Sequence, residues 1–218
     1  MIAEGRSNRA LLEKYNMALT NAEQQSQIAE ALSNYGYNAA KIAEGRALLN
    51  TAETVYETQN TEHLQENQAY ALYLPHYESV RTAYQSHRRL AKVVFKNDHV
   101  ALSALKLTGR TPEAYIKWLD TIEAFYNGIL NNTDYLAKMA TLNITQQDLQ
   151  EVQNNINLMV DARTNYQRER GESQDATKAK DQAFADIAEW MSDFYAVARV
   201  ALQDHPQLLE SLDKFVRS

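Results

Sequence analysis

The sequence predicts an all-α protein built from long helices, and its composition supports this fold class in three ways. Only 6 glycines and 3 prolines occur in 218 residues, so residues that interrupt helices are scarce. Ala, Leu, Gln and Glu are frequent, whereas the regular β-branched alternation of strands is missing. Hydrophobic residues make up 44% of the chain, which is enough to fill a sizeable core. We therefore expect a helical protein that folds by itself.

An internal repeat organises the chain. When the sequence is compared with itself at an offset of 107 residues, which becomes 106 in the last third, apolar positions match along the whole length. For example, Leu49 matches Ile156 and Tyr84 matches Trp190. We therefore predict a duplicated helical unit, with repeats at residues 1–108 and 109–218 that together form one bundle.

Helix caps divide each repeat into four helical pieces. Thr111-Pro112-Glu113 predicts the start of a helix of about 18 residues, with a hydroxyl N-cap and a proline in the first turn. Thr145 and Asp148 form a capping-box pattern that starts the next helix, and Asn38 occupies the matching place in the first repeat. Each repeat is expected to end in a short helix with an aspartate N-cap, Asp98 in the first repeat and Asp204 in the second.

The two middle pieces of each repeat carry apolar stripes of helical period, which predict antiparallel helices of roughly 30 residues. Turns near residues 60–61 and at 171–173 would join them into hairpins and would set Gly45 against Tyr77. Two such long hairpins predict an elongated four-helix bundle, whose ends are capped by the short helices. Pro75 lies inside one of the long helices and predicts a kink.

Five segments of the chain resemble an uncharacterised bacterial family of internally duplicated helical-bundle proteins. The resemblance spans nearly the full length and is carried by GYNAAKIAEG, WLDTIEAFYNGIL, LNITQQDL, GESQDATKAKDQAF and ARVALQDHPQLLESL. It implies the duplicated helical fold. Because the family has no known activity, the resemblance implies no catalytic residue, cofactor or partner.

No pattern of catalytic or metal-binding residues is found in the sequence. A ferritin-like di-iron site needs two Glu-x-x-His pairs, and none of the five histidines follows a glutamate at that spacing. No phosphate-binding loop occurs. The repeated Asp98-His99 and Asp204-His205 pairs fit helix starts better than metal ligands. We therefore expect no catalytic residues, no metal and no cofactor, and we favour a protein that is not an enzyme.

The composition is unusual in its tyrosine content, with 13 tyrosines in the chain. The spacing of Tyr70, Tyr73, Tyr77 and Tyr84 places them on one helix face, which His87 continues at a core-like position. A buried imidazole needs a hydrogen-bond partner, such as a tyrosine or a backbone carbonyl. This face either fills a wide seam between helices or forms a surface for a ligand or a partner helix.

A basic segment follows the tyrosines. Arg81, Arg88, Lys92 and Lys96 recur close to helical spacing, with no acidic residue between Glu78 and Asp98. Residues 1–107 hold 11 basic and 11 acidic groups and residues 108–218 hold 11 and 17, so the net charge of −6 argues against nucleic-acid binding. The basic segment is expected to be either a solvated helix face or a docking surface for an acidic protein or a second copy of the chain.

The sequence contains no cysteine, no apolar run long enough to span a membrane and no signal-peptide pattern, which predicts a cytoplasmic protein without membrane contact. The favoured function is a non-catalytic protein-interaction or structural helical-bundle module. The alternative is a small-molecule carrier or an enzyme that uses a pocket near His87 and the tyrosine face. The sequence leaves the ligand, the partner and the oligomeric state open.

Overall fold

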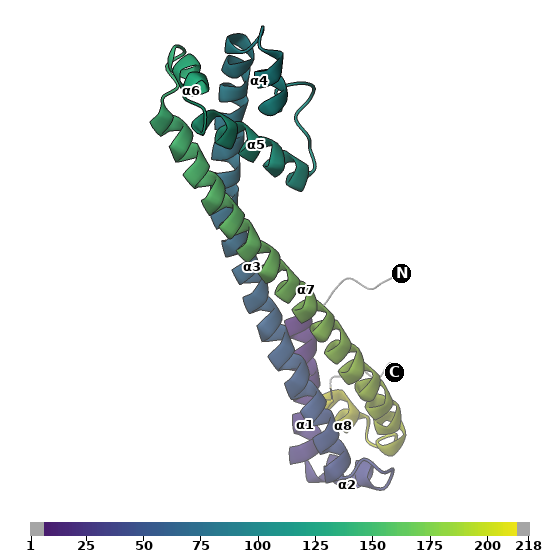
Figure 1. Cartoon of the computed structure of the whole chain (residues 1–218). Coiled ribbons are helices and arrows are strands. Elements are labelled where there is room, and N and C mark those ends of the chain that lie inside the picture. The colour runs from purple at the N-terminus through teal and green to yellow at the C-terminus, as the bar shows by residue number, and fades with distance from the viewer. Residues whose placement is uncertain (1–6, 213–218) are drawn as a thin grey trace. The chain divides into compact units, whose positions relative to one another are not determined.

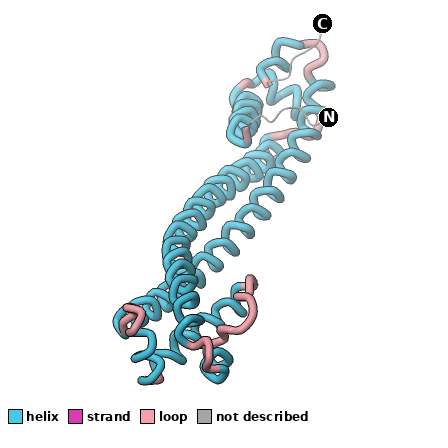
Figure 2. Tube along the Cα trace, turned by 90° about the horizontal axis from the view of Figure 1, so that it is seen from above, coloured by secondary structure: helices cyan, strands magenta, loops and turns pink. Residues whose placement is uncertain are grey.

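A computed structural model describes residues 7–212, and within this range the chain forms helices and no strand, which confirms the all-α fold class. Figure 2 shows that loops occur only as short connections between the helices. No described helix combines the length and apolarity needed to cross a membrane. The helices, labelled in Figure 1, are α1 (Asn8–Gln24), α2 (Ser26–Ser33), α3 (Ala39–Val94), α4 (His99–Ala104), α5 (Tyr115–Leu130), α6 (Thr133–Ala140), α7 (Gln146–Ala201) and α8 (Pro206–Ser211).

Two helices of 56 residues, α3 and α7, replace the predicted hairpins. The turns expected near residues 60–61 and at 171–173 are wrong, because the helix continues through both places. The first place contains no glycine or proline. Gly171 alone costs a helix only about 1 kcal/mol, and extending a helix that has already formed is easy compared with starting a new one. Pro75 lies inside α3, and the kink expected there stays a prediction.

The described residues divide into two compact units. Unit 1 contains residues 7–64 and 170–212, and unit 2 contains residues 65–169. Each unit has its own hydrophobic core of buried residues. Helices α3 and α7 each contribute one part to unit 1 and another part to unit 2. The boundaries of the two units therefore differ from those of the predicted repeats 1–108 and 109–218. Each unit is built from residues of both repeats.

In unit 1 the first part of α3 packs against the last part of α7 in antiparallel orientation. Gly45 lies directly under the ring of Trp190, and the ring centroids of Tyr56 and Phe184 are 6.2 Å apart. The expectation that Gly45 faces Tyr77 is therefore wrong. The small residue does lie opposite a large one, but the partner helix comes from the other half of the chain.

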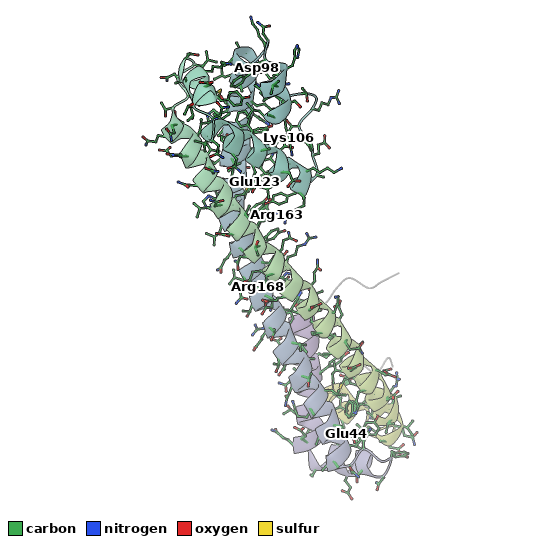
Figure 3. All side chains as sticks on the ribbon, viewed as in Figure 1. Glu44, Asp98, Lys106, Glu123, Arg163 and Arg168 are labelled. Atoms are coloured by element: carbon green, nitrogen blue, oxygen red, sulfur yellow. The ribbon has the colours of Figure 1, made fainter. Side chains whose placement is uncertain are left out.

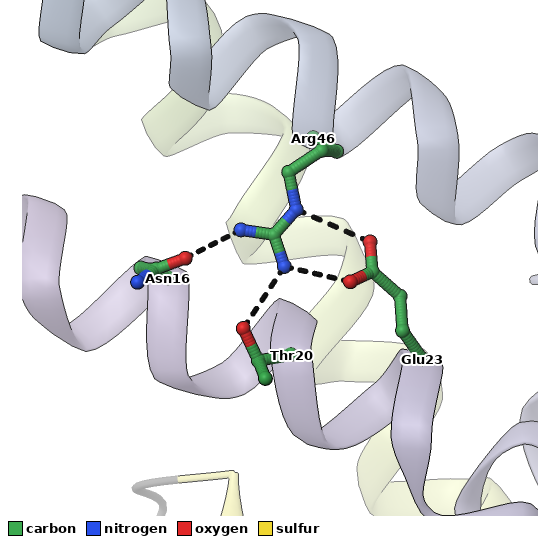
Figure 4. Close-up of polar contacts among 4 residues, drawn as sticks. All are labelled: Asn16, Thr20, Glu23 and Arg46. Carbon is green, nitrogen blue, oxygen red and sulfur yellow. Dashed lines mark hydrogen bonds and ion pairs between the residues drawn. The ribbon is translucent and has the colours of Figure 1, made fainter.

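A network around Arg46 fixes α1 against α3 in unit 1 (Figure 4). The Arg46 guanidinium donates from Nε to Glu23 Oε1 at 3.1 Å and from Nη2 to Glu23 Oε2 at 2.8 Å. The same Nη2 donates to the Thr20 hydroxyl at 3.1 Å, and Nη1 donates to the Asn16 side-chain oxygen. A two-pronged arginine–carboxylate contact restricts orientation as well as distance. The network therefore fixes the register of α1 on α3.

Local capping agrees with the sequence at three helix starts. Thr145 and Asp148 bond reciprocally, with the Thr145 amide donating to the Asp148 carboxylate at 2.7 Å and the Asp148 amide donating to the Thr145 hydroxyl at 3.1 Å. Asn38 accepts from the amide three residues later at 3.1 Å, and Asp98 does the same at 2.9 Å. These three caps are confirmed.

Two predicted helix starts are wrong. The N-cap of α8 is His205 and not Asp204, because Pro206 takes the first helical position and makes its predecessor the cap. Helix α5 starts at Tyr115, so residues 111–113 precede it. Those residues form an irregular loop that lines a cavity in unit 2.

The helical glycines Gly45 and Gly171 should respond in opposite ways to replacement by alanine. A Cβ at Gly171 meets open space, so Gly171→Ala should raise the free energy of unfolding by about 0.5–1 kcal/mol. A Cβ at Gly45 would overlap the ring of Trp190, so Gly45→Ala should lower that free energy by about 1–3 kcal/mol. Chemical denaturation followed by circular dichroism measures both changes. A destabilised Gly171→Ala protein would contradict the continuous α7.

Cutting the chain in the loop before α5 should leave the two fragments associated, because each compact unit contains residues from both sides of the cut. A protease site inserted between Gly109 and Arg110 would allow the cut in the folded protein. The two fragments should co-elute with the uncut protein in size-exclusion chromatography and should separate in denaturant. Two fragments that separate without denaturant and keep their helical circular dichroism would contradict the shared cores.

Candidate functional site

Unit 2 is formed by the last part of α3, the first part of α7 and the helices α4, α5 and α6. The two long helices are antiparallel here too, since Tyr70 contacts Tyr166 and Ser79 accepts a hydrogen bond from Asn155 at 2.9 Å. Helix α5 packs on α3 through buried rings, and the centroids of Tyr84 and Phe125 are 5.4 Å apart. This arrangement brings side chains of three helices into one region.

A cavity of about 490 Å³ lies in unit 2 between α3, α5, α7 and the loop before α5. We call it the aromatic pocket, because six of its lining residues carry aromatic rings. The remaining lining residues are mostly polar, and they include two arginines and one glutamate. The lining residues are Tyr73, Tyr77, Arg81, Tyr84, Gln85, Thr111, Pro112, Glu113, Tyr115, Trp118, Arg163, Tyr166 and Gln167.

The rings of the pocket contact one another across helices. Tyr73 and Tyr77 lie four residues apart on α3, which places both on the same face. The Tyr73 ring is nearly parallel to the ring of Tyr166 on α7, with an interplanar angle of 7° and centroids 6.1 Å apart. Tyr77 contacts Trp118 of α5 at 5.2 Å between centroids. Tyr70 extends the row at a more exposed position, since 43% of its surface is accessible.

Arg163 is the half-buried cation of the pocket. Its guanidinium carbon lies 3.7 Å from the ring centroid of Tyr115, the first residue of α5. Figure 3 labels Arg163 on α7. Burial raises the pKa of the Tyr73 phenol to about 12, although the nearby Arg163 opposes the shift. Arg163 forms no ion pair with any residue between 7 and 212. The pocket therefore holds a partly desolvated cation whose protein contacts are neutral aromatic groups.

Arg88 supports the wall of the pocket. It donates from Nη2 to the backbone carbonyls of Leu107 and Gly109, at 3.2 and 2.9 Å. Gly109 has φ +71°, which glycine adopts without strain. Burial raises the pKa of Tyr84, a shift that Arg88 and Thr111 oppose. Arg88 thus anchors the loop whose next residues line the pocket.

The four cations predicted as one basic face have different environments in the structure. Arg81 is exposed and lines the aromatic pocket, whereas Arg88 is half-buried and bonded to the loop before α5. Lys92 is half-buried and Lys96 is exposed. Only part of the predicted face is therefore open for contact with an acidic surface.

His87 lies at a second cavity of unit 2, of about 720 Å³, and not in the aromatic pocket. Its Nδ1 lies 3.1 Å from the Tyr126 hydroxyl, which is a hydrogen bond between the ring and the phenol. Burial lowers the pKa of His87, and the nearby Asp148 opposes this shift. The Asp148 carboxylate accepts from the amide and the hydroxyl of Thr145, so it serves the α7 cap. The predicted face of tyrosines and His87 is thus divided between two cavities.

The sequence reasoning missed most lining residues of the aromatic pocket, and the aromatic or cationic ones among those missed are Tyr115, Trp118, Arg163 and Tyr166. All four lie in the second half of the chain, whereas the predicted face lies in the first. The hairpin prediction packed the tyrosines against a helix of their own repeat. Residues of the other half of the chain were therefore not considered as their neighbours. The spacing of Tyr115 and Trp118, three residues apart on one helix, is the signal that could have identified two of them.

Replacing Arg88 by glutamine should destabilise unit 2, because it removes two hydrogen bonds from a charged donor to loop carbonyls. We expect a loss of roughly 1–3 kcal/mol in the free energy of unfolding. Arg89 is exposed on the same helix and is the matched control, so Arg89→Gln should change this free energy by less than about 0.5 kcal/mol. Equal unfolding midpoints for the two variants would show that Arg88 does not anchor the loop.

Comparison of the chain with protein-family models, with curated proteins and with solved structures gives no match.

Proposed function

We propose that the protein is a non-catalytic binding module and that the aromatic pocket of unit 2 binds a small molecule. The observation that carries this proposal is a cavity of about 490 Å³ lined by six aromatic rings and six polar side chains. Binding sites for small molecules are typically concave, about 300–1,000 Å³ in volume, and mainly apolar with a few polar groups. The pocket therefore favours the carrier that the sequence analysis kept as its alternative.

The tyrosines support binding more than acid–base catalysis. A phenol with a pKa of about 12, as at Tyr73, stays protonated at neutral pH, so it is a poor general base. Burial also raises the pKa of Tyr84 and of Tyr115. Neutral phenols can still donate hydrogen bonds and offer flat apolar faces to a ligand.

We also propose that the chain arose by internal duplication, and the helix lengths support this origin. They are 17, 8, 56 and 6 residues for α1–α4, and 16, 8, 56 and 6 residues for α5–α8. Helix α3 begins at residue 39 and α7 at residue 146, a difference of 107, and α4 and α8 begin at residues 99 and 206, which is the same difference. The offset of 107 thus extends into the last third, where the sequence comparison used 106. With an offset of 107 the counterpart of Trp190 is Ala83 and no longer Tyr84.

The turns before the two long helices also support the duplication. Gly36 has φ +87° and Asn143 has φ +59°, and these residues are again 107 apart. In both turns the next amide, of Tyr37 or of Ile144, donates to the carbonyl five residues earlier, at 3.1 and 3.3 Å. This bond is typical of a Schellman helix ending. An experimental structure in which residues 8–33 fail to superpose on residues 115–140 would contradict the duplication.

A protein-interaction or structural role is the second candidate, in a cytoplasmic protein with an acidic partner or a second copy of the chain. The observation that favours it is the exposure of Val93 at 61% and of Val100 at 75%, on either side of the exposed Lys96 in the sequence. An exposed apolar residue next to a cation is suited to contact with an acidic protein surface. Charge reversal at Lys96 should then weaken partner capture in a pull-down, and unchanged capture would contradict this role.

The binding proposal predicts that the purified protein carries or accepts a small molecule at the aromatic pocket. Native mass spectrometry of the protein, as purified and after incubation with a metabolite extract, should show a bound mass. Tyr77→Leu, which removes a pocket ring but keeps apolar volume, should lower the bound fraction about tenfold or more, as expected from the loss of stacking contacts.

Tyr56→Leu is the matched control for this experiment, because Tyr56 is a half-buried, ring-packed tyrosine of unit 1 outside the aromatic pocket. The control variant should keep the bound mass. Circular dichroism melting curves identify any variant that fails to fold. A protein that neither carries a bound mass nor gains one from the extract would contradict the proposed function.

A further inference from the structure

We infer that the aromatic pocket selects a planar anion, of the class of aromatic carboxylates, and holds its negative group at Arg163 and Arg81. This inference rests on the proposed binding function and adds the charge and shape of the ligand. Arg163 comes from α7 and Arg81 from α3, and both line the cavity.

Arg163 differs from the other partly buried arginines in what it contacts. Arg46 has a carboxylate as a two-pronged acceptor, and Arg88 has two backbone carbonyls. Arg163 lies on the face of Tyr115 and near the phenol of Tyr73, with no ion pair among the described residues. A guanidinium is a planar donor that matches a carboxylate through two parallel hydrogen bonds. A bound carboxylate would thus give Arg163 the kind of acceptor that Arg46 finds within the protein.

The charge of the lining residues distinguishes an anion site from a cation site. Aromatic rings alone are also the usual cage for a quaternary ammonium group. Here Arg163 already occupies the face of Tyr115 at 3.7 Å. Arg81 adds a second positive charge, and Glu113 is the single acidic residue among the lining residues. The lining therefore carries a net charge of one positive unit, which repels a cationic ligand and attracts an anion.

The ring geometry favours a flat ligand. Tyr73 and Tyr166 present nearly parallel planes, and Tyr77 with Trp118 adds further ring surface from α3 and α5. Aromatic groups bind to such surfaces through offset stacking or edge contacts. Because the Tyr73 phenol has a pKa of about 12, it stays protonated and can donate to an anion at neutral pH.

Three probes of similar size test the inference on the full chain: cinnamate, its neutral amide cinnamamide, and the cation phenyltrimethylammonium. Saturation-transfer NMR detects binding of each probe, and isothermal titration calorimetry measures the dissociation constants. We expect cinnamate to bind at least about tenfold more tightly than cinnamamide, and phenyltrimethylammonium to bind more weakly than either. Added salt should weaken the binding of cinnamate more than that of the amide.

Variants of the lining arginines test whether the preference for an anion comes from the aromatic pocket. Arg163→Gln should weaken cinnamate binding by about tenfold or more and should leave cinnamamide binding nearly unchanged. Arg163→Lys should retain part of the preference, because it keeps the charge but loses the planar fork. Arg81→Gln gives an independent test if Arg163→Gln fails to fold. Arg89→Gln, exposed on α3 and outside the pocket lining, should bind cinnamate like the unmodified protein.

The outcomes separate this inference from the proposed function. Equal binding of the acid and the amide, an insensitivity to Arg163→Gln, or a preference for phenyltrimethylammonium would overturn the anion preference and leave the binding function standing. Binding of none of the probes would also overturn it. The binding function itself would fall only if native mass spectrometry detects no bound mass in the purified or extract-treated protein.

Discussion

The packing of α3 against α7 is the interaction on which the rest of the structure depends. A helix of 56 residues exposes an apolar stripe along its length, and a stripe of that kind needs a partner surface of similar length. In unit 1 the partner contact is Gly45 with Trp190, and in unit 2 it is Tyr70 with Tyr166. The shorter helices complete each core around these contacts. Each of the two described cores contains residues from both halves of the chain, and so does the aromatic pocket.

The features that the sequence predicted correctly are those decided within a few residues. Asn38 and the Thr145–Asp148 pair were identifiable as caps because each hydrogen bond spans three residues. The turn expected at Gly171 was wrong for the opposite reason. A glycine is compatible with a turn and with a helix interior, and the choice between them depends on burial elsewhere in α7. Local pattern alone does not contain that information.

In the candidate site too, the sequence predicted what is set within one helix but not what is set by contacts between helices. The periodicity of α3 placed Tyr73, Tyr77 and Tyr84 on one face, and all three line the pocket. Arg163 and Tyr166 could not be assigned to it, because their approach depends on which helix is the partner of α3. His87 follows the tyrosines in the sequence, yet its ring reaches the Tyr126 hydroxyl at the other cavity. Helical spacing fixes the direction in which a residue points, but the neighbouring helices determine what it meets.

Three arginines show that the role of a side chain depends on the groups around it. Arg46, Arg88 and Arg163 have the same side chain and similar partial burial. The first fixes a helix through a carboxylate, the second fixes a loop through carbonyls, and the third lies on an aromatic ring in a cavity. The third has no carboxylate or backbone carbonyl among its hydrogen-bond acceptors in the described residues, so its guanidinium can still bind an anionic ligand. The spacing of residues in the sequence does not distinguish the roles of these three arginines.

The contact of Gly45 with Trp190 affects which halves of the chain can pack against each other. Under the proposed duplication, the counterpart of Gly45 is Val152 and the counterpart of Trp190 is Ala83, and these two line one cavity of unit 2. A first repeat paired with another first repeat would set Gly45 against Ala83 and leave the volume of an indole ring empty. A second repeat paired with its own copy would press Val152 onto Trp190. Divergence at these four positions therefore favours the packing of a first half on a second half over the packing of two like halves.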